Sequence, residues 1–317
     1  MGQGFDYIDL FAGIGGLRIP FDELGGRCVF TSENDIFATK TYERNFPETN
    51  EIFGDINQLE TEGVDFVPEH DLLLAGFPCQ PFSSAGRRGG FEDARGTLFF
   101  NVLRILEKKR PKVVLLENVR GLKNHDGGNT FRVILNSLQD LDYLVHSKVL
   151  NARDFGLPQN RERIFIVAIH KSLEDGYKFE FPAPTHKRED LRLGSVLEKS
   201  TQDKLVISDQ IWAGHIERKR RNRELGRGFG YQIFDEDSPY SATLSARYYK
   251  DGSEILIAQK EGNPRKLSAN EAKLLQGFPD WFVPASSYQQ ALKQFGNSVP
   301  VPVVRAIAKS LVVYLEG

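Results

Sequence analysis

The sequence predicts an α/β protein built on a doubly wound, mostly parallel sheet, with a second, smaller domain of irregular structure. Over the first 180 residues, short apolar runs alternate with segments whose apolar residues recur at helical spacing, a pattern typical of βαβ units covered by helices on both faces. After Pro184 the apolar periodicity weakens and charged residues become dense. These two observations predict the fold class and a boundary near residue 184.

The expected strands of the sheet are five apolar runs. They are Tyr7 to Phe11, Cys28 to Ser32, Asp71 to Gly76, Lys112 to Glu117 and Arg163 to Ile169. A helix is expected from Thr97 to Lys108, because its apolar residues recur every three or four positions and Arg110 and Pro111 close it. A final helix is expected from about Val301, where prolines suit the first turn.

Composition excludes several classes of protein. Two cysteines in 317 residues cannot build a disulfide framework, and no Cys/His cluster has the spacing of a zinc site, so we expect no metal. The apolar runs are far shorter than the roughly 20 residues that cross a membrane, and no leader opens the sequence. We therefore expect a cytoplasmic protein without membrane contact.

The net charge of −2 argues on average against a nucleic-acid binder, because phosphate contacts favour a basic excess. Positive charge is nevertheless concentrated. Residues 185–230 hold eleven Lys and Arg against seven Asp and Glu, with the densest run from Arg218 to Arg221. This run is compatible both with the solvated face of a helix and with a surface that binds nucleic acid.

A glycine-rich turn follows the first strand and opens a helix. Phe11, Ala12, Gly13, Gly15 and Gly16 form this turn, and Glu33 ends the second strand. Glycines let a backbone approach a ligand closely, and a carboxylate can accept hydrogen bonds from ribose hydroxyls. Because Arg18 stands where the dinucleotide fingerprint has its third glycine, the motif favours a nucleoside ligand without a pyrophosphate. A purely structural turn is the alternative.

Cys79 follows the third strand, at the sheet edge where open α/β proteins bind ligands. Pro78 and Pro81 stiffen its loop, which a merely buried cysteine would not need. We therefore interpret Cys79 as a nucleophile, and Cys28, at the start of the second strand, as a core residue.

Other polar residues stand at the ends of predicted elements. Glu117 closes an apolar strand, where a carboxylate is either capped locally or has a raised pKa suited to proton transfer. Arg161 and Arg163 begin the last strand, where they could hold a phosphate or a planar polar group, or form an exposed ion-paired turn. Asn297 and Ser298 could cap the final helix or contact a ligand.

Taken in order, these motifs resemble those of the C5-cytosine DNA methyltransferases of bacterial restriction-modification systems. The resemblance covers nearly the whole chain. Its motifs are Asp9 to Gly16, Gly76 to Gln80, Glu117 to Val119, Gln159 to Arg163 and Gly296 to Ser298. It implies the S-adenosylmethionine-dependent methyltransferase fold, with a catalytic domain of residues 1–184 and 286–317 and a target-recognition domain, including a hinge, of residues 185–285.

The resemblance also implies the chemistry. A cytosine flipped out of duplex DNA would receive a methyl group at C5 from S-adenosylmethionine, leaving S-adenosylhomocysteine, through a covalent bond between Cys79 and C6. Glu117 would bind the N3 edge of the base, Arg163 its O2 atom, and Arg161 would support the site. The implied cofactor-binding residues are Phe11, Ala12, Gly13, Gly15, Gly16, Glu33, Asn34, Asp55, Ile56, Gly76, Pro78, Leu98, Asn297 and Ser298. Asn34 stands where some relatives carry an aromatic residue that packs on the adenine.

Contacts to DNA are expected from a mobile loop over residues 83–96 and from the smaller domain. The residues concerned are Gln80, Ser83, Arg87, Arg88, Arg95, Arg227, Thr243 and Arg247, with Thr243 near the target strand by resemblance. The expected partners are double-stranded DNA and a cognate restriction endonuclease that is not stably bound, and the expected state is a monomer.

Three other functions remain open. A tRNA cytosine-C5 methyltransferase shares the loop of Cys79 and the Glu117 motif, but the basic, glycine-interrupted segment fits the DNA branch better. A nicotinamide-dependent dehydrogenase is compatible with Gly13, Gly15 and Glu33, although the missing third glycine argues against it. A non-catalytic binding module is disfavoured because all catalytic positions are present.

Overall fold

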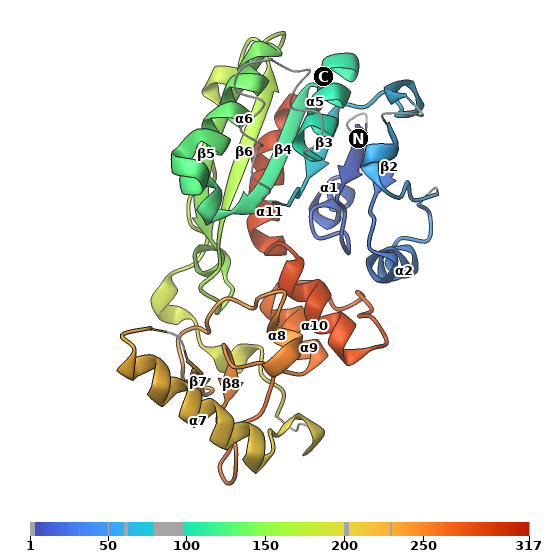
Figure 1. Ribbon diagram of the computed structural model, residues 1–317. Helices are drawn as coiled ribbons and strands as arrows, with labels where there is room; N and C mark the ends of the chain where they lie inside the picture. Colours follow the sequence, from blue (N-terminus) through green and yellow to red (C-terminus); the bar gives the residue numbers. More distant parts are fainter. Residues whose placement is uncertain are drawn as a thin grey trace. The chain divides into compact units, whose positions relative to one another are not determined.

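The computed structural model describes residues 4–49, 51–59, 63–78, 98–199, 203–228 and 230–316. The chain divides into two compact units (Figure 1). Unit 1 comprises Met1–Leu150, Glu162–Ala183 and Val303–Gly317, and unit 2 comprises Asn151–Arg161 and Pro184–Pro302. These bounds differ from the expected domains at residues 151–161, 184 and 286–302, which cluster with unit 2. The assignment of catalysis and target recognition to two domains stays a prediction.

Unit 1 is built on a six-stranded sheet with the strand order β2-β1-β3-β4-β6-β5. The strands are β1 (Asp6–Leu10), β2 (Arg27–Ser32), β3 (Leu72–Ala75), β4 (Val113–Val119), β5 (Tyr143–Asn151) and β6 (Glu162–His170). The pairs β2–β1, β1–β3 and β3–β4 are parallel, whereas β6 runs antiparallel to β4. The α/β class and the mostly parallel sheet are confirmed, and each of the five expected strands is present within two residues of its expected bounds.

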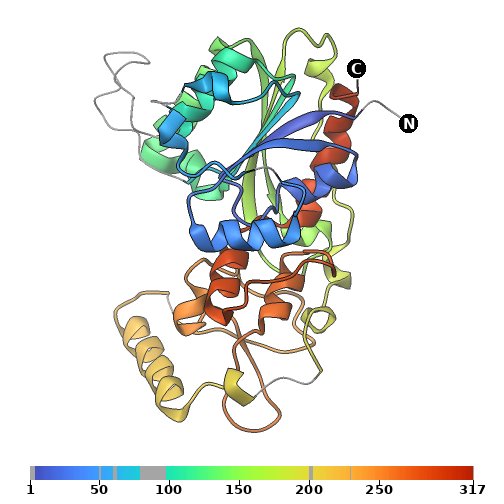
Figure 2. The same cartoon turned by 90° about the vertical axis from the view of Figure 1, so that its right-hand side faces the viewer.

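Helices cover both faces of this sheet. They are α1 (Arg18–Glu23), α2 (Ile36–Asn45), α5 (Leu98–Lys109), α6 (Asn129–Asp140) and α11 (Val301–Leu311). In Figure 2, which shows the sheet nearly edge-on, α5 and α6 lie on one side and α1 and α11 on the other. This arrangement is the doubly wound architecture that the alternation of apolar runs and helical segments predicts.

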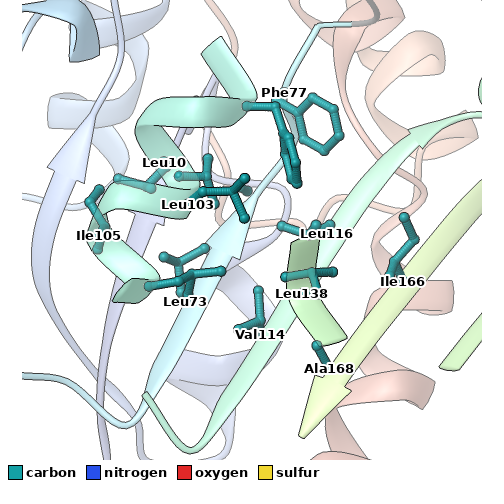
Figure 3. Close-up of a cluster of buried hydrophobic side chains, with 14 of the residues drawn as sticks. Leu10, Leu73, Phe77, Leu103, Ile105, Val114, Leu116, Leu138, Ile166 and Ala168 are labelled. Atoms are coloured by element: carbon teal, nitrogen blue, oxygen red, sulfur yellow. The ribbon is translucent and has the colours of Figure 1, made fainter. Parts of the chain in front are cut away.

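The core between the sheet and α5 and α6 follows from the two-residue period of the strands (Figure 3). Ile8, Leu10, Leu73, Val114 and Leu116 point to this face. Leu103 and Ile105 from α5 and Leu138 from α6 pack on them, all at most 2% exposed. Because the strands are buried on both faces, they form continuous apolar runs, and they were therefore recognisable in the sequence.

Some elements were not expected. Strand β5 is an edge strand in which most side chains are half-buried or exposed, so it lacks the continuous apolar run of the central strands. Helix α2 begins after Asp35, whose side chain accepts a hydrogen bond from the backbone N–H of Phe37, and buries three residues only. Burial on one narrow face gives a weak sequence pattern.

Unit 2 is irregular, as expected. It holds α7 (Asp209–Glu224), α8 (Tyr248–Asp251), α9 (Ala269–Leu275), α10 (Tyr288–Asn297) and two short parallel strands, β7 (Ile233–Phe234) and β8 (Leu256–Ile257). A buried ion pair stabilises it: the guanidinium of Arg265 donates to both carboxylate oxygens of Glu271, each at 2.7 Å. In the described part of the chain, no helix combines the length and apolarity needed to cross a membrane.

Candidate active site

The glycine-rich turn lies directly after β1 in unit 1. Phe11, Gly13 and Gly15 adopt positive φ angles of 54°, 57° and 83°. Gly15 also has to be glycine for steric reasons, because a Cβ atom there would lie 2.3 Å from a ring carbon of Phe46. The guanidinium carbon of Arg18 in turn lies over the ring of Phe46, 4.2 Å from the ring centroid. The glycine-rich turn therefore packs directly against the ring of Phe46.

Arg18 anchors the helix that the turn opens. It is 2% exposed, and its guanidinium donates to Asp22 at 2.7 Å and to the Thr49 hydroxyl at 2.5 Å. It also pairs with Glu48. The side chain that replaces the third fingerprint glycine thus holds α1 against the segment that follows α2.

Glu33 is held beside the turn by two backbone groups. Its Oε2 accepts from the N–H of Gly13 at 2.7 Å, and its Oε1 accepts from the N–H of Asp35 at 2.7 Å. Each carboxylate oxygen retains a lone pair, so a diol could donate to it without breaking these bonds. The structure therefore brings Glu33 and the turn together, as the sequence predicts, while Asn34 is exposed.

The segment of Asp55 and Ile56 lies beside the end of β2. Glu33 N–H donates to the carbonyl of Phe53, and the Ser32 hydroxyl donates to the carbonyl of Gly54. Asp55 then caps a short 3-10 turn, and Ile56 is 3% exposed in the core. Three of the predicted cofactor segments, including residues 11–16 and 33–34, are therefore adjacent at the carboxyl ends of β1 and β2.

These residues fit a nucleoside cofactor such as S-adenosylmethionine. The turn offers close backbone approach, and Glu33 offers an oriented carboxylate at the position where a ribose would lie. Ile56 is 3% exposed in the core, and its role as an apolar border of the cofactor stays a prediction.

The carboxyl end of β3 leads toward the predicted nucleophile. The side-chain amide of Asn118 donates to the carbonyl of Phe77 at 2.8 Å, and both residues are buried. This bond fixes the chain just before Pro78, which is exposed. Residues 79–97 lie outside the described residues, among them Cys79, Gln80, Ser83, Arg87, Arg88 and Arg95. Leu98, the first described residue after them, starts α5 and packs against the core.

Glu117 and Arg163 form an ion pair at the same edge of the sheet. Nε of Arg163 lies 3.0 Å from Oε1 of Glu117, and their side chains are 13% and 10% exposed. The antiparallel register places Arg163 opposite Val119, two residues from Glu117. A Cβ at Gly76 would lie 3.6 Å from Oε2 of Glu117, so the carboxylate reaches the strand end that precedes Cys79. Burial lowers the pKa of Arg163, and the charge of Glu117 opposes this shift.

Arg161, by contrast, belongs to unit 2 and is 0% exposed. Its guanidinium donates to the backbone carbonyls of Leu244, Gly296 and Ser298. These contacts fit the predicted supporting role, and participation in the chemistry stays a prediction. The sequence alone assigns no role to the buried Gln159 or to Asn118, although both stand inside the motifs that contain Arg161 and Glu117.

The remaining predicted residues of unit 2 are accessible. Asn297 is exposed at the end of α10, and Ser298 closes that helix through its backbone N–H. Thr243 is half-buried and donates to the carbonyl of Asn160 at 2.5 Å. Arg227 and Arg247 are exposed. Their contacts to cofactor or DNA stay predictions.

The basic run of residues 218–221 lies on α7, where His215 alone among the helix's residues is buried. Arg220 pairs with Glu217 and Glu224 on the same helix, and Arg218 pairs with Asp251 at 2.8 Å. Two of its four cations are thus balanced by neighbouring carboxylates. This arrangement favours the interpretation as a solvated helix face.

Cys28 is a half-buried residue of β2. Its sulfur lies 3.4 Å from the hydroxyl of Thr31, and burial raises the pKa of the thiol to about 11. A thiol that stays protonated at neutral pH is a poor nucleophile, which fits its interpretation as structural. Among the described residues, no group of three or more His, Cys, Asp or Glu could hold a metal ion; the expectation of no metal stays a prediction.

The fold is that of the S-adenosylmethionine-dependent methyltransferases. Solved structures with this fold include a Spodoptera frugiperda DNMT2 mutant, at a TM-score of 0.76 and 23% identity over 97% of this chain and 99% of that chain. The S. pombe Dnmt2 methyltransferase follows at a TM-score of 0.75 and 20% identity over 98% of this chain and 99% of that chain. At these identities the likeness concerns the fold.

The family follows from the sequence comparisons. Residues 5–313 match the family model of the C-5 cytosine-specific DNA methylases, and the chain belongs to this family. It is 53% identical to the Type II methyltransferase M1.ScrFI of Lactococcus lactis subsp. cremoris over 98% of this chain and 79% of that protein. It is 51% identical to M.DsaV of Dactylococcopsis salina over 98% of this chain and 86% of that protein, and 40% identical to M.HhaI of Haemophilus parahaemolyticus over 97% and 94%.

Proposed function

We propose that this protein transfers a methyl group from S-adenosylmethionine to C5 of a flipped-out cytosine within a short, specific sequence of duplex DNA. The observation that carries this proposal is the pair of Glu117 and Arg163 beside Gly76. A carboxylate next to a guanidinium offers acceptors and donors that suit the edge of one pyrimidine, and the chain reaches Cys79 three residues after Gly76. The family membership supports the same activity.

In the proposed reaction the Cys79 thiolate forms a bond from Sγ to C6 of the base, and the electrons of the C5–C6 double bond move into the ring. A proton delivered through Glu117 to N3 neutralises the charge that develops there, and Arg163 holds O2. Bound S-adenosylmethionine supplies an electrophilic methyl group, which C5 takes up while the sulfur keeps the bonding pair.

The enzyme is then regenerated by elimination. Water removes the C5 proton, the electrons of that bond restore the C5–C6 double bond, and the bond from C6 to Sγ breaks to release the thiolate. The N3 proton returns to Glu117. Covalent catalysis of this kind divides one difficult substitution into easier steps. The target base must leave the stack for this attack, at a cost of a few kcal/mol.

The residues that hold the cofactor in this proposal are those of the glycine turn, Glu33, Asp55 and Ile56 in unit 1. The family resemblance adds Asn34, Gly76, Pro78 and Leu98 of the same unit, and Asn297 and Ser298 of unit 2, as further candidate cofactor contacts. The residues that would contact DNA are Gln80, Ser83, Arg87, Arg88, Arg95, Arg227, Thr243 and Arg247. Type II methyltransferases are named among the relatives, and we extend to this chain the pairing with a restriction endonuclease. We propose a monomer that does not bind the endonuclease stably.

The experiment offers methyl-labelled S-adenosylmethionine together with mixed-sequence duplex DNA or with tRNA. We expect label in the duplex, loss of transfer in Cys79→Ala, and full transfer in the control Cys28→Ala. Label in tRNA alone would contradict the DNA substrate, and transfer by Cys79→Ala would contradict its role as nucleophile. Bisulfite sequencing of a plasmid from cells expressing the protein then gives the recognition sequence.

A further inference from the structure

Two fully buried polar side chains in unit 2 connect segments that are far apart in the sequence. Gln159 and Arg161 are both 0% exposed. Gln159 accepts from the N–H of Leu244 at 2.9 Å and donates to the carbonyl of Leu275 at 2.9 Å. We call Gln159 and Arg161 the buried polar pair.

The first segment that this pair holds is residues 241–244. Ser241 N–H donates to the carbonyl of Pro158, and Asn160 N–H donates to the carbonyl of Ser241, both at 2.9 Å. Arg161 donates to the carbonyl of Leu244 at 2.7 Å. The Thr243 hydroxyl also donates to the carbonyl of Asn160. Residues 241–244 therefore lie alongside residues 158–161 and are joined to them by successive hydrogen bonds. The backbone on both sides of the Thr243 side chain is therefore fixed.

The second segment is the end of α10. The same guanidinium donates to the carbonyl of Gly296 at 2.9 Å and to that of Ser298. These carbonyls flank Asn297, whose side chain is exposed. The two segments also touch each other, because a Cβ on Gly296 would lie 2.2 Å from the carbonyl oxygen of Ser245. The hydrogen bonds of Arg161 thus fix the backbone at Asn297 relative to the backbone at Thr243.

We propose that Arg161 is a positioning residue that holds the cofactor-contacting residues Asn297 and Ser298 and the DNA-contacting residue Thr243 in fixed register. This inference rests on the proposed function, because it takes these residues as ligand contacts. Because one guanidinium is bonded to both segments, it orients the residues that contact the cofactor and the residue that contacts DNA. Lysine cannot replace it, because its single nitrogen lacks the planar array of donors that reaches three carbonyls in different places.

The expected effect of Arg161→Lys is the weakening of two separate affinities. The dissociation constant for S-adenosylhomocysteine, measured by calorimetry, should rise about 10-fold, the size expected when hydrogen bonds to a charged group are lost. The dissociation constant for a short duplex containing the methylated site should rise by about as much. Asn297→Ala should weaken the first affinity alone, and Thr243→Val the second alone.

A double-mutant cycle tests whether Arg161 acts through Asn297. If it does, adding Asn297→Ala to Arg161→Lys weakens S-adenosylhomocysteine binding far less than Asn297→Ala does in the wild type. The matched control is Arg265→Lys, which alters an arginine that is 3% exposed in the same unit and paired with Glu271. It should lower the melting temperature comparably while changing each affinity less than about twofold.

Equal affinity losses in the Arg161 and Arg265 variants would overturn the inference, as would loss of one affinity alone or full additivity in the cycle. Should Arg161→Lys fail to fold, Gly296→Ala separates the same two segments and should weaken both affinities. The proposed function fails in a different way, because the wild-type protein itself would then lack affinity for S-adenosylhomocysteine, for duplex DNA or for both.

Discussion

Nε of Arg163 lies 3.0 Å from Oε1 of Glu117, across the antiparallel pair of β4 and β6. Both side chains are nearly buried, and removing one member of such a pair leaves an uncompensated charge. The carboxylate of Glu117 also reaches the strand end at Gly76, so the pair places hydrogen-bond donors and acceptors next to the chain that leads to Cys79. This relationship connects the fold to the proposed chemistry.

Glu117→Gln should reduce kcat by about 100- to 10,000-fold, because an amide cannot deliver a proton to N3. The measurement is single-turnover methyl transfer to duplex DNA. The matched control is Glu162→Gln on the neighbouring strand, whose carboxylate pairs with Arg120 and is 36% exposed. It should keep nearly all activity. Equal activity of the two variants would remove Glu117 from the chemistry.

Glu33→Gln should raise the KM for S-adenosylmethionine about 10-fold while kcat changes little, since it weakens charge-assisted bonds to a ribose. The amide has one acceptor oxygen, whereas Glu33 now accepts from both Gly13 and Asp35. Initial rates at varied cofactor concentration give both constants. Glu23→Gln, which alters a half-exposed carboxylate paired with Arg305, is the control. An unchanged KM for Glu33→Gln would show that the ribose binds elsewhere.

Asp9 should make stability depend on pH. Burial raises the pKa of its carboxyl from 3.8 to about 7, and the Tyr42 hydroxyl, 3.2 Å away, opposes this shift. The folded protein therefore keeps a proton that the unfolded chain releases above pH 4, so this group's contribution to stability falls as pH rises to 7 and is level above it. The Asp9→Asn variant has no titrating carboxyl at this position, so its stability should not fall for this reason.

Thermal unfolding of both proteins between pH 5 and 8 provides the measurement. The wild type should lose stability relative to Asp9→Asn by on the order of 3 kcal/mol over this interval. Stability profiles that run parallel at all pH values would contradict the raised pKa.

Gly296→Ala should lower the free energy of unfolding by about 1–3 kcal/mol, because the added methyl group overlaps the backbone of Ser245. Chemical denaturation monitored by circular dichroism measures this change. Gly214→Ala on the exposed helix α7 is the opposite case: nothing lies within 4 Å of its Cβ, and it should add up to about 1 kcal/mol. If both variants lost the same stability, the close approach at Gly296 would be wrong.

The sequence predicts the sheet of unit 1 well because β1, β3 and β4 are buried on both faces and therefore appear as continuous apolar runs. Edge strand β5 could not be predicted from the sequence, because its side chains are partly exposed and form no continuous apolar run. Among site residues, Glu33 could be placed beside the glycine turn because parallel strands bring their carboxyl ends to one edge. The pairing of Glu117 with Arg163 could not, because it depends on β6 running antiparallel to β4.

In unit 2, contacts between charged and polar side chains that are distant along the chain could not be predicted from the sequence. The run of residues 218–221 is basic in sequence, yet its charge is partly balanced by Glu217, Glu224 and Asp251, the last of which is distant along the chain. The buried polar pair likewise becomes visible only when residues 159–161, 244 and 296–298 are in contact. Periodicity carries no information on such long-range polar contacts.

The central claim, covalent catalysis by Cys79, is tested most directly by trapping the intermediate. In DNA that carries 5-fluorocytosine, the fluorine at C5 cannot be lost as a proton, so elimination of the enzyme is blocked. With S-adenosylmethionine present, we predict a complex that survives denaturation and whose linked peptide, identified by mass spectrometry, contains Cys79. Linkage through Cys28, or turnover of unsubstituted DNA without any trapped complex on the fluorinated DNA, would contradict the account.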